Sequence, residues 1–347
     1  MNDFVSDKIK VISFFAILLV LYIHSGFHPS ELRGLSLNTY VQNFISGKIG
    51  RCAVPLFFMI SGYLFFYRGI DSLSSVFEKM KKRAQTLLIP YICAAIFFVL
   101  FSYLMTILPG ASKFVNSSIV PLFDLHWTKI LKAVFIDAGN GSPLAFQLWF
   151  LRDLMVILLF SPIWYFLIKY LKYYWLPVVF VLSLFTIPYF PVNALFWFIT
   201  GASLKHIDIN KTYRQLGFLC LSLFILIGFL EIFMPNPNLK YIQKPIVLLG
   251  VFGMWSVYNI VVPISFRLSE HKILRQACSF TFLVYLFHEP TLNVFRKVVV
   301  FILGKNEIGY LLSYMISPWI YIIFTMLVGF LLKKYIPTFY STIVGGR

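Results

Sequence analysis

Long runs without a single charged residue constrain this chain more than any other feature of its sequence. Residues 84–108 and 308–332 hold no Asp, Glu, Lys or Arg. Each run is longer than the roughly 20 residues that a helix needs to cross a bilayer. With 59% hydrophobic and 12% charged residues among 347, the composition lies far from that of soluble domains. We therefore expect an all-α, polytopic integral membrane helical bundle.

The apolar runs predict about ten transmembrane helices. Neither a linker nor an internal repeat divides them, so we expect a single integral-membrane domain, 1–347, with a transmembrane core of about 9–332. The first run lacks a small-residue cleavage site and is predicted to stay as a membrane helix. The expected spans are approximately 9–27, 45–67, 84–107, 147–168, 173–190, 192–204, 214–233, 246–266, 276–295 and 309–332.

The positive charges predict the orientation. Lys and Arg form short clusters between the apolar runs, as they do in cytoplasmic loops. With the N-terminus inside, the inner segments hold 18 of them and the outer loops hold 8. Both termini are therefore expected in the cytoplasm of a cell (inner or plasma) membrane. The same placement argues against nucleic acid as a partner despite the net charge of +17, and favours membrane lipid.

Ionisable groups inside apolar runs are costly in a membrane and are usually kept for function. His24 lies near the outer end of the first expected span. Arg51 and Arg152 lie near the starts of two spans that enter from the same side. The expected topology brings these residues to one level, together with a predicted substrate-binding set of Gln147, Trp149, Ser61, His288 and Glu289.

Each of these residues also has a purely structural interpretation. A lone histidine such as His24 near a helix end is often an interfacial residue, and His288 could simply hydrogen-bond a neighbouring helix. Arg51 could extend its alkyl stem outward to the headgroups. The basic cluster of Lys79, Lys81, Lys82 and Arg83 is most often a topology determinant. The four cysteines have no paired spacing and predict buried thiols, with neither a disulfide framework nor a metal site.

Six motifs, taken together, resemble the membrane acyltransferase-3 family. The run from Arg51 to Phe66, RCAVPLFFMISGYLFF, looks like the family's second-helix signature, and His24 in VLYIHS looks like its first-helix histidine. The others are QLWFLRDL (147–154), FWFITGASL (196–204), SFTFLVYLFHEP (279–290) and KKRAQTLLIPY (81–91). The resemblance implies a ten-helix core that moves acyl groups, usually acetyl from acetyl-CoA, onto envelope polysaccharides, lipids or other exported glycans.

Two positions depart from the family pattern. The family commonly has a basic residue eleven positions before the first-helix histidine, but Ser13 stands there, and Lys10 lies about one turn further away. Gln147 replaces a histidine that related chains often carry before LWFL. Lys10 can take the place of the family's basic first-helix residue only if the site tolerates a shift of one helical turn.

The chemistry of acyl transfer suits these residues. A sugar hydroxyl needs a base, which a neutral His24 can supply, and the tetrahedral oxyanion needs positive charge, which Arg152 or Arg51 can supply. Acetyl-CoA is the expected donor and a glycan or lipid-linked glycan the expected acceptor, without a metal. The anionic donor would bind at Lys10, Lys79, Lys82 and Arg83. Whether His24 is a base or is transiently acylated stays open.

Two other classes of protein fit parts of the sequence. A polytopic transporter or flippase for a glycan or anionic substrate could also have ten helices, buried arginines and basic inner loops. Transporters often show internal repeats with broken helices in matched positions, and no such pair is evident. A structural membrane protein would have no need for buried histidine and arginine. An enzyme, an O-acetyltransferase, is therefore the favoured interpretation.

Overall fold

The computed structural model describes residues 3–67, 70–110, 126–139, 141–188, 190–204, 213–234 and 242–346, apart from the side chain of Thr106. Over these ranges the chain is helical, with short 3-10 turns, and the described residues form no β-strand beyond one isolated bridge between Ile187 and Phe190. The all-helical prediction is confirmed.

Fourteen α-helices and three 3-10 turns follow one another along the described chain. They are α1 (Asp3–Ser25), α2 (Ser36–Ile45), η1 (Ile49–Cys52), α3 (Ala53–Phe66), α4 (Leu73–Ile107), α5 (Trp127–Phe135), η4 (Phe146–Leu148), α6 (Trp149–Leu159), α7 (Ser161–Leu171), α8 (Leu176–Leu182), α9 (Val192–Ser203), α10 (Arg214–Phe233), α11 (Gln243–Val261), η7 (Leu268–Glu270), α12 (Lys272–Leu303), α13 (Glu307–Tyr335) and α14 (Pro337–Ile343).

Among the described residues, five segments are long and apolar enough to cross a membrane. They are Ser36–Phe66, Leu73–Met105, Arg214–Phe233, Gln243–Val261 and Glu307–Tyr335. A sixth results if Phe146–Leu159 and Ser161–Leu171, which meet at 66°, form one broken span. The chain is thus a multi-pass membrane protein, whereas the count of ten and the cytoplasmic termini stay predictions. Six cations used for that orientation, Arg68, Lys113, Lys205, Lys211, Lys240 and Arg347, lie outside the described residues.

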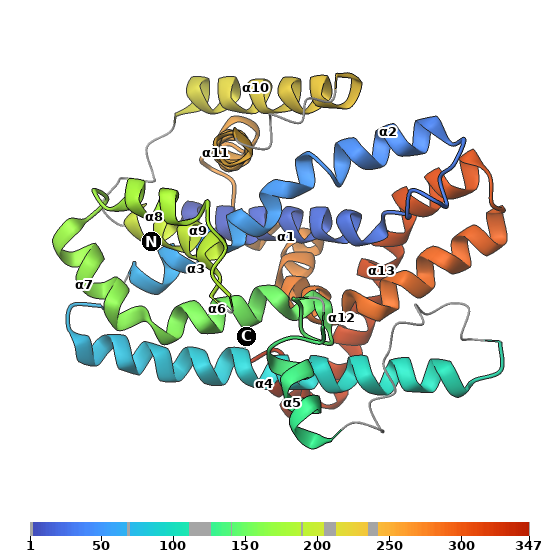
Figure 1. Cartoon of the computed structure of the whole chain (residues 1–347), viewed down its shortest axis with the longest axis horizontal. Coiled ribbons are helices and arrows are strands. Elements are labelled where there is room, and N and C mark those ends of the chain that lie inside the picture. The colour runs from blue at the N-terminus through green and yellow to red at the C-terminus, as the bar shows by residue number, and fades with distance from the viewer. Residues whose placement is uncertain are drawn as a thin grey trace.

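Helix α1 occupies the middle of the molecule. It packs against α3, α11, α12 and α13, and most of its residues are buried. Figure 1 shows α1 crossing the centre, with α10 at one edge and α4 at the opposite edge. The helix that carries His24 is therefore surrounded by protein and has little contact with lipid.

Helix α12 is broken where it passes α1. Its backbone leaves the helical region at Glu289, with φ −108° and ψ 137°, and Pro290 follows. Proline has no N–H to donate and its ring clashes with the preceding turn, which bends a helix. The break lies directly after His288, and both His288 and Glu289 are buried there.

Two glycines allow α3 and α9 to pack backbone against backbone. A Cβ on Gly62 would lie 1.9 Å from the carbonyl oxygen of Phe198, and one on Gly201 would lie 1.9 Å from that of Met59. Small residues at such crossings permit the close approach that drives helix association in membranes. The pair fixes the position of α3, which forms one wall of the cavity described below.

We predict that Gly201→Ala destabilises the protein, because its Cβ would meet backbone that cannot move aside. Overpacking of this kind typically costs about 1–3 kcal/mol. The matched control is Gly228→Ala, whose Cβ would meet side-chain atoms of Lys48, at 3.2 Å, and Phe44, at 3.9 Å, and no backbone atom among its nearest neighbours. Thermal unfolding of the two purified variants measures the difference, and equal melting temperatures would contradict the close crossing.

Candidate active site

A cavity of about 990 Å³ runs along one side of α1. Its walls come from α1, α3, α4, α6 and α12, with Tyr340 of α14, Val344 just after α14 and the 267–269 turn at one end. Lys10 and His24 both line it. Fourteen residues of helix separate them, so at 1.5 Å per residue the cavity extends about 21 Å along α1. This volume is in the range of cavities that hold drug-sized and cofactor-sized ligands.

His24 lies at the end of this cavity that is farther from Lys10 along α1. Its ring is 5.5 Å from that of Phe146 and 4.9 Å from that of His288, measured between centroids. The lining stops at His24 and Gln147, and no residue of 25–53 or 291–335 contributes to it. An imidazole at this point is half-buried yet open to whatever occupies the cavity.

Gln147 is fixed beside His24 by contacts at both its backbone and its side chain. Its Nε2 donates to the carbonyl of Glu289 at 3.0 Å, and its own carbonyl accepts from the Tyr285 hydroxyl at 3.0 Å. Gln147 is 2% exposed, and its Oε1 has no hydrogen-bond partner among the described residues. An acceptor atom is thus left free where the cavity ends. Trp149 and Ser61 line the same cavity and are half-buried.

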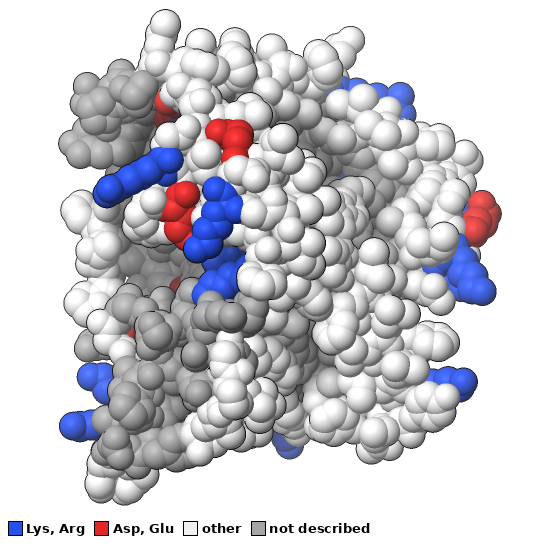
Figure 2. Space-filling view, turned by 90° about the vertical axis from the view of Figure 1, so that its right-hand side faces the viewer, with Lys and Arg blue, Asp and Glu red and all other residues white. Residues whose placement is uncertain are grey.

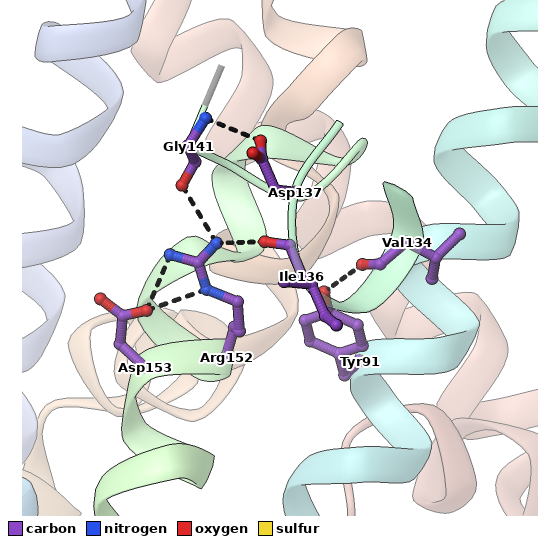
Figure 3. A network of polar contacts seen from close by, with 7 residues as sticks. All are labelled: Tyr91, Val134, Ile136, Asp137, Gly141, Arg152 and Asp153. Atoms are coloured by element: carbon purple, nitrogen blue, oxygen red, sulfur yellow. Dashed lines mark hydrogen bonds and ion pairs between the residues drawn. The ribbon is translucent and has the colours of Figure 1, made fainter. Parts of the chain in front are cut away.

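Arg152 does not line the cavity. Its Nε and NH2 donate to Asp153 Oδ1 at 2.9 Å, and its NH1 donates to the carbonyls of Ile136, at 2.7 Å, and Gly141, at 3.1 Å. Figure 3 shows the Arg152 guanidinium bound both to Asp153 and to backbone carbonyls of the loop that follows α5. The sequence predicted the depth of Arg152 in the membrane but not the direction of its side chain. Its neighbours Trp149 and Leu151 face the cavity, while the Arg152 side chain is directed to the loop.

Arg51 directs its side chain to α11 and not into the cavity. It lies in η1, is exposed, and donates through NH1 to Gln243 Oε1 of α11 at 2.7 Å. Gln243 in turn donates to Glu231, which also pairs with Lys48. Arg51 belongs to this network between η1, α10 and α11 and does not line the cavity. The structure therefore brings neither predicted arginine into the cavity that reaches His24.

Four cations line the other end of the cavity. They are Lys10, Arg83, Arg267 and Arg275. The Lys10 side chain is 54% exposed, so the cavity opens to the surface here. Of the predicted cluster, only Arg83 takes part: Lys82 is exposed and does not line the cavity, and the Lys79 ammonium donates to the carbonyl of Phe65 at 2.9 Å.

Two acidic residues, Asp3 and Asp7, share this mouth. Asp7 is occupied, because its Oδ2 accepts from the backbone N–H of Leu268 at 2.9 Å and its Oδ1 pairs with Lys10 at 3.4 Å. Among the described residues, the guanidinium groups of Arg267 and Arg275 donate through NH1 to backbone carbonyls of residues 264, 266 and 269, at 3.1–3.3 Å. The mouth therefore presents an excess of positive charge with donors left for an anion.

Sequence reasoning missed three arginines of this region. Arg267 and Arg275 counted only as loop charges, and nothing in the sequence indicates that the turn before α12 folds over the start of α1. Arg296, treated as the edge of a span, is 8% exposed and donates through NH1 to the carbonyl of Gly26, just after α1. Because helix α12 breaks at Glu289, between His288 and Arg296, no regular helical spacing in the sequence relates these two residues.

Two further observations bear on ligands. Among the described residues, no group of three or more His, Cys, Asp and Glu side chains is arranged to hold a metal ion. Figure 2 views the right-hand side of Figure 1, the side toward which α1 runs. There the coloured residues show Lys and Arg beside Asp and Glu on a largely uncharged surface. Those residues form no single-sign patch of the kind that attracts a polyanion.

Comparison with known proteins gives the chain a family. The family model described as "Acyltransferase domain" (Acyl_transf_3) matches residues 7–336. The "Succinoglycan biosynthesis protein ExoH" of Rhizobium meliloti (strain 1021) is 24% identical over 383 residues, covering 100% of this chain and 94% of that protein. No solved structure matches.

The match covers nearly the whole chain, including the helices that carry Lys10, His24, Gln147 and His288. It favours the acyltransferase interpretation over the transporter interpretation that the apolar runs left open. The chain belongs to the membrane acyltransferase-3 family and is an acyltransferase.

Proposed function

We propose that the protein transfers acetyl from acetyl-CoA to a hydroxyl of a cell-surface polysaccharide, lipid-linked glycan or other exported glycan. The observation that carries the proposal is the single cavity that joins a cationic mouth to His24. Such a shape suits a donor with a phosphorylated head and a long, flexible arm that ends in a thioester. The relative from Rhizobium meliloti, named for succinoglycan biosynthesis, supports a glycan acceptor.

The donor is made in the cytoplasm, and the positive-inside bias puts the mouth of the cavity on that side. Phosphates favour Arg and Lys partners, and charge-assisted hydrogen bonds are the strong ones. Arg83, Arg267 and Arg275 would hold the phosphates, with Lys10 beside them. The pantetheine arm would then follow α1 through the apolar middle of the cavity toward His24. The proposal therefore assigns donor binding to Arg83 and Lys10, and not to Lys79 or Lys82.

His24 would act as the base at the reacting end. Its lone pair takes the proton of the acceptor hydroxyl as the oxygen attacks the thioester carbonyl, and the C–S bond then breaks. The thiolate leaves with the proton that His24 returns. Gln147, Trp149 and Ser61 line this end and would contact the acyl group or the acceptor. Arg51 and Arg152 have no part in this proposal, since both lie off the cavity.

We predict that His24→Ala lowers turnover by about 10²–10⁴-fold, the usual cost of losing a general base. The assay is transfer of labelled acetyl from acetyl-CoA to de-O-acetylated surface polysaccharide by purified protein. His126→Ala, an exposed histidine at the start of α5, serves as the matched control. A well-folded His24→Ala protein that keeps more than about a tenth of wild-type turnover would refute the assignment.

We predict a different result at the mouth of the cavity. Arg83→Gln combined with Arg267→Gln should raise the KM for acetyl-CoA about 10-fold or more, with a smaller change in kcat, because the donor's ground state and transition state both lose the contacts. The effect should shrink at high salt, which screens exposed charges. The control is Lys81→Gln with Lys82→Gln, two exposed lysines that do not line the cavity.

Comparing the two double variants distinguishes a role of these cations in donor binding from a role in membrane topology. If these cations only orient the helices, both double variants would insert poorly, and the folded fraction of each would bind acetyl-CoA as the wild type does. Donor affinity is therefore measured on the folded, detergent-purified fraction. Equal affinities of the two double variants would contradict the donor site proposed for the mouth.

A further inference from the structure

His288 is buried behind His24 and does not line the cavity. Its residue is 0% exposed, and its Nδ1 lies 2.6 Å from the carbonyl oxygen of Tyr285. Its Nε2 is buried and has no hydrogen-bond partner among the described residues. A buried polar atom without a hydrogen-bond partner costs free energy. The groups beside Nε2 therefore indicate which partner it can bind.

The contact with Tyr285 determines which nitrogen of His288 carries hydrogen. A carbonyl oxygen can only accept, so Nδ1 is the donor. In the neutral ring Nε2 then keeps its lone pair and can only accept. His288 therefore offers one buried acceptor whose direction is fixed by the backbone of α12.

The ring nearest to this acceptor on the cavity side is His24. The two centroids are 4.9 Å apart and the ring planes are inclined at 52°. Because each ring nitrogen lies about 1 Å from its centroid, this separation allows nitrogens to approach to about 3 Å, normal hydrogen-bond range. The described structure shows no hydrogen bond to Nε2, but an N–H on His24 is a donor of the right kind at a ring separation from which such a bond can form.

Arg296 holds the two helices in this relation. Its NH1 donates to the carbonyl of Gly26, two residues after His24, and its NH2 donates to Asn293 Oδ1 at 2.7 Å on its own helix. The guanidinium also lies over the ring of Phe27, 4.6 Å from its centroid. The end of α1 is therefore tied to α12 one to two turns beyond His288, which limits how far the two rings can separate.

We propose that His288 is a positioning residue whose Nε2 accepts a hydrogen bond from His24. This inference rests on the proposed function, in which His24 is the base. The bond would keep the hydrogen of neutral His24 on the nitrogen that faces α12, so that the other nitrogen presents its lone pair to the cavity. As His24 takes the hydroxyl proton and becomes charged, the same bond would strengthen and stabilise the imidazolium.

This role differs from that of a residue that binds substrate directly. The proton passes from the acceptor hydroxyl to His24, the new C–O bond forms, the C–S bond breaks, and the thiolate takes the proton from His24. His288 neither gains nor loses a proton in this sequence. It sets the tautomer of the base, as an orienting residue does in other catalytic groups that depend on histidine.

The test combines nitrogen NMR and kinetics on the full chain in nanodiscs. In protein labelled with ¹⁵N-histidine, wild-type His24 should appear as a single neutral tautomer. His288→Phe, which keeps a ring but has no acceptor, should mix the two tautomers of His24. It should also lower kcat by about 10²-fold, the scale of a misdirected base, with the KM for acetyl-CoA within about twofold of wild type.

His288→Gln supplies the conservative comparison, because its Oε1 can accept a hydrogen bond. It should retain a higher kcat than His288→Phe and a less mixed His24 signal. His126→Ala controls both measurements and identifies one of the six histidine signals. Thermal unfolding of each variant shows whether it is folded.

Three results would overturn the inference. One is a mixture of His24 tautomers in the wild type, which needs no variant at all. Another is an unchanged His24 signal in His288→Phe. The last is a raised KM for the de-O-acetylated polysaccharide with unchanged kcat, which would make His288 a substrate contact. If the wild type instead fails to use acetyl-CoA, the proposed function fails, and the nitrogen spectrum still decides the pairing.

Discussion

The burial of α1 at the centre of the bundle is the constraint on which the rest of the structure depends. A histidine facing lipid would be costly, but α1 is surrounded by α3, α11, α12 and α13. His24 can therefore stay in the membrane with one side on a cavity and the other on protein. The glycine crossing of α3 with α9 and the bond from Arg296 to Gly26 both maintain this enclosure.

Helix α1 is long enough that its two ends lie in different chemical environments. Its first turns reach the cationic mouth, which opens to the surface at Lys10. Its last turn carries His24 to the other end, which is lined largely by aromatic and apolar side chains and where electrostatic interactions are stronger than in water. An acyl donor that spans this distance would present its charged head and its reactive end to the two environments that suit them.

The sequence predicted the all-helical fold, and several of the residues it proposed for the site line one cavity. Uncharged runs specify helices that cross a membrane, so the all-helical fold followed from composition and length. His24, Gln147, Trp149, Ser61, Lys10 and Arg83 all line the cavity. His24, Trp149 and Ser61 were proposed from motif and depth, whereas Lys10 and Arg83 were proposed from their positive charge on the expected cytoplasmic side.

What the sequence did not predict was direction around each helix. Successive residues of an α-helix point about 100° apart, so depth alone cannot tell which side chain faces the cavity. Arg152 shares a level with His24 but grips a loop, and Lys82 is exposed although Arg83, its neighbour, lines the mouth. Arg267 and Arg275 join the mouth through a turn whose position only the folded chain determines.

A structure of the protein with a non-hydrolysable thioether analogue of acetyl-CoA would test the central claim most directly. The account predicts the phosphates of the analogue against Arg83, Arg267 and Arg275, and its acyl carbonyl within hydrogen-bond reach of the His24 ring. An analogue bound outside the cavity, or one whose acyl end lies away from His24, would contradict it.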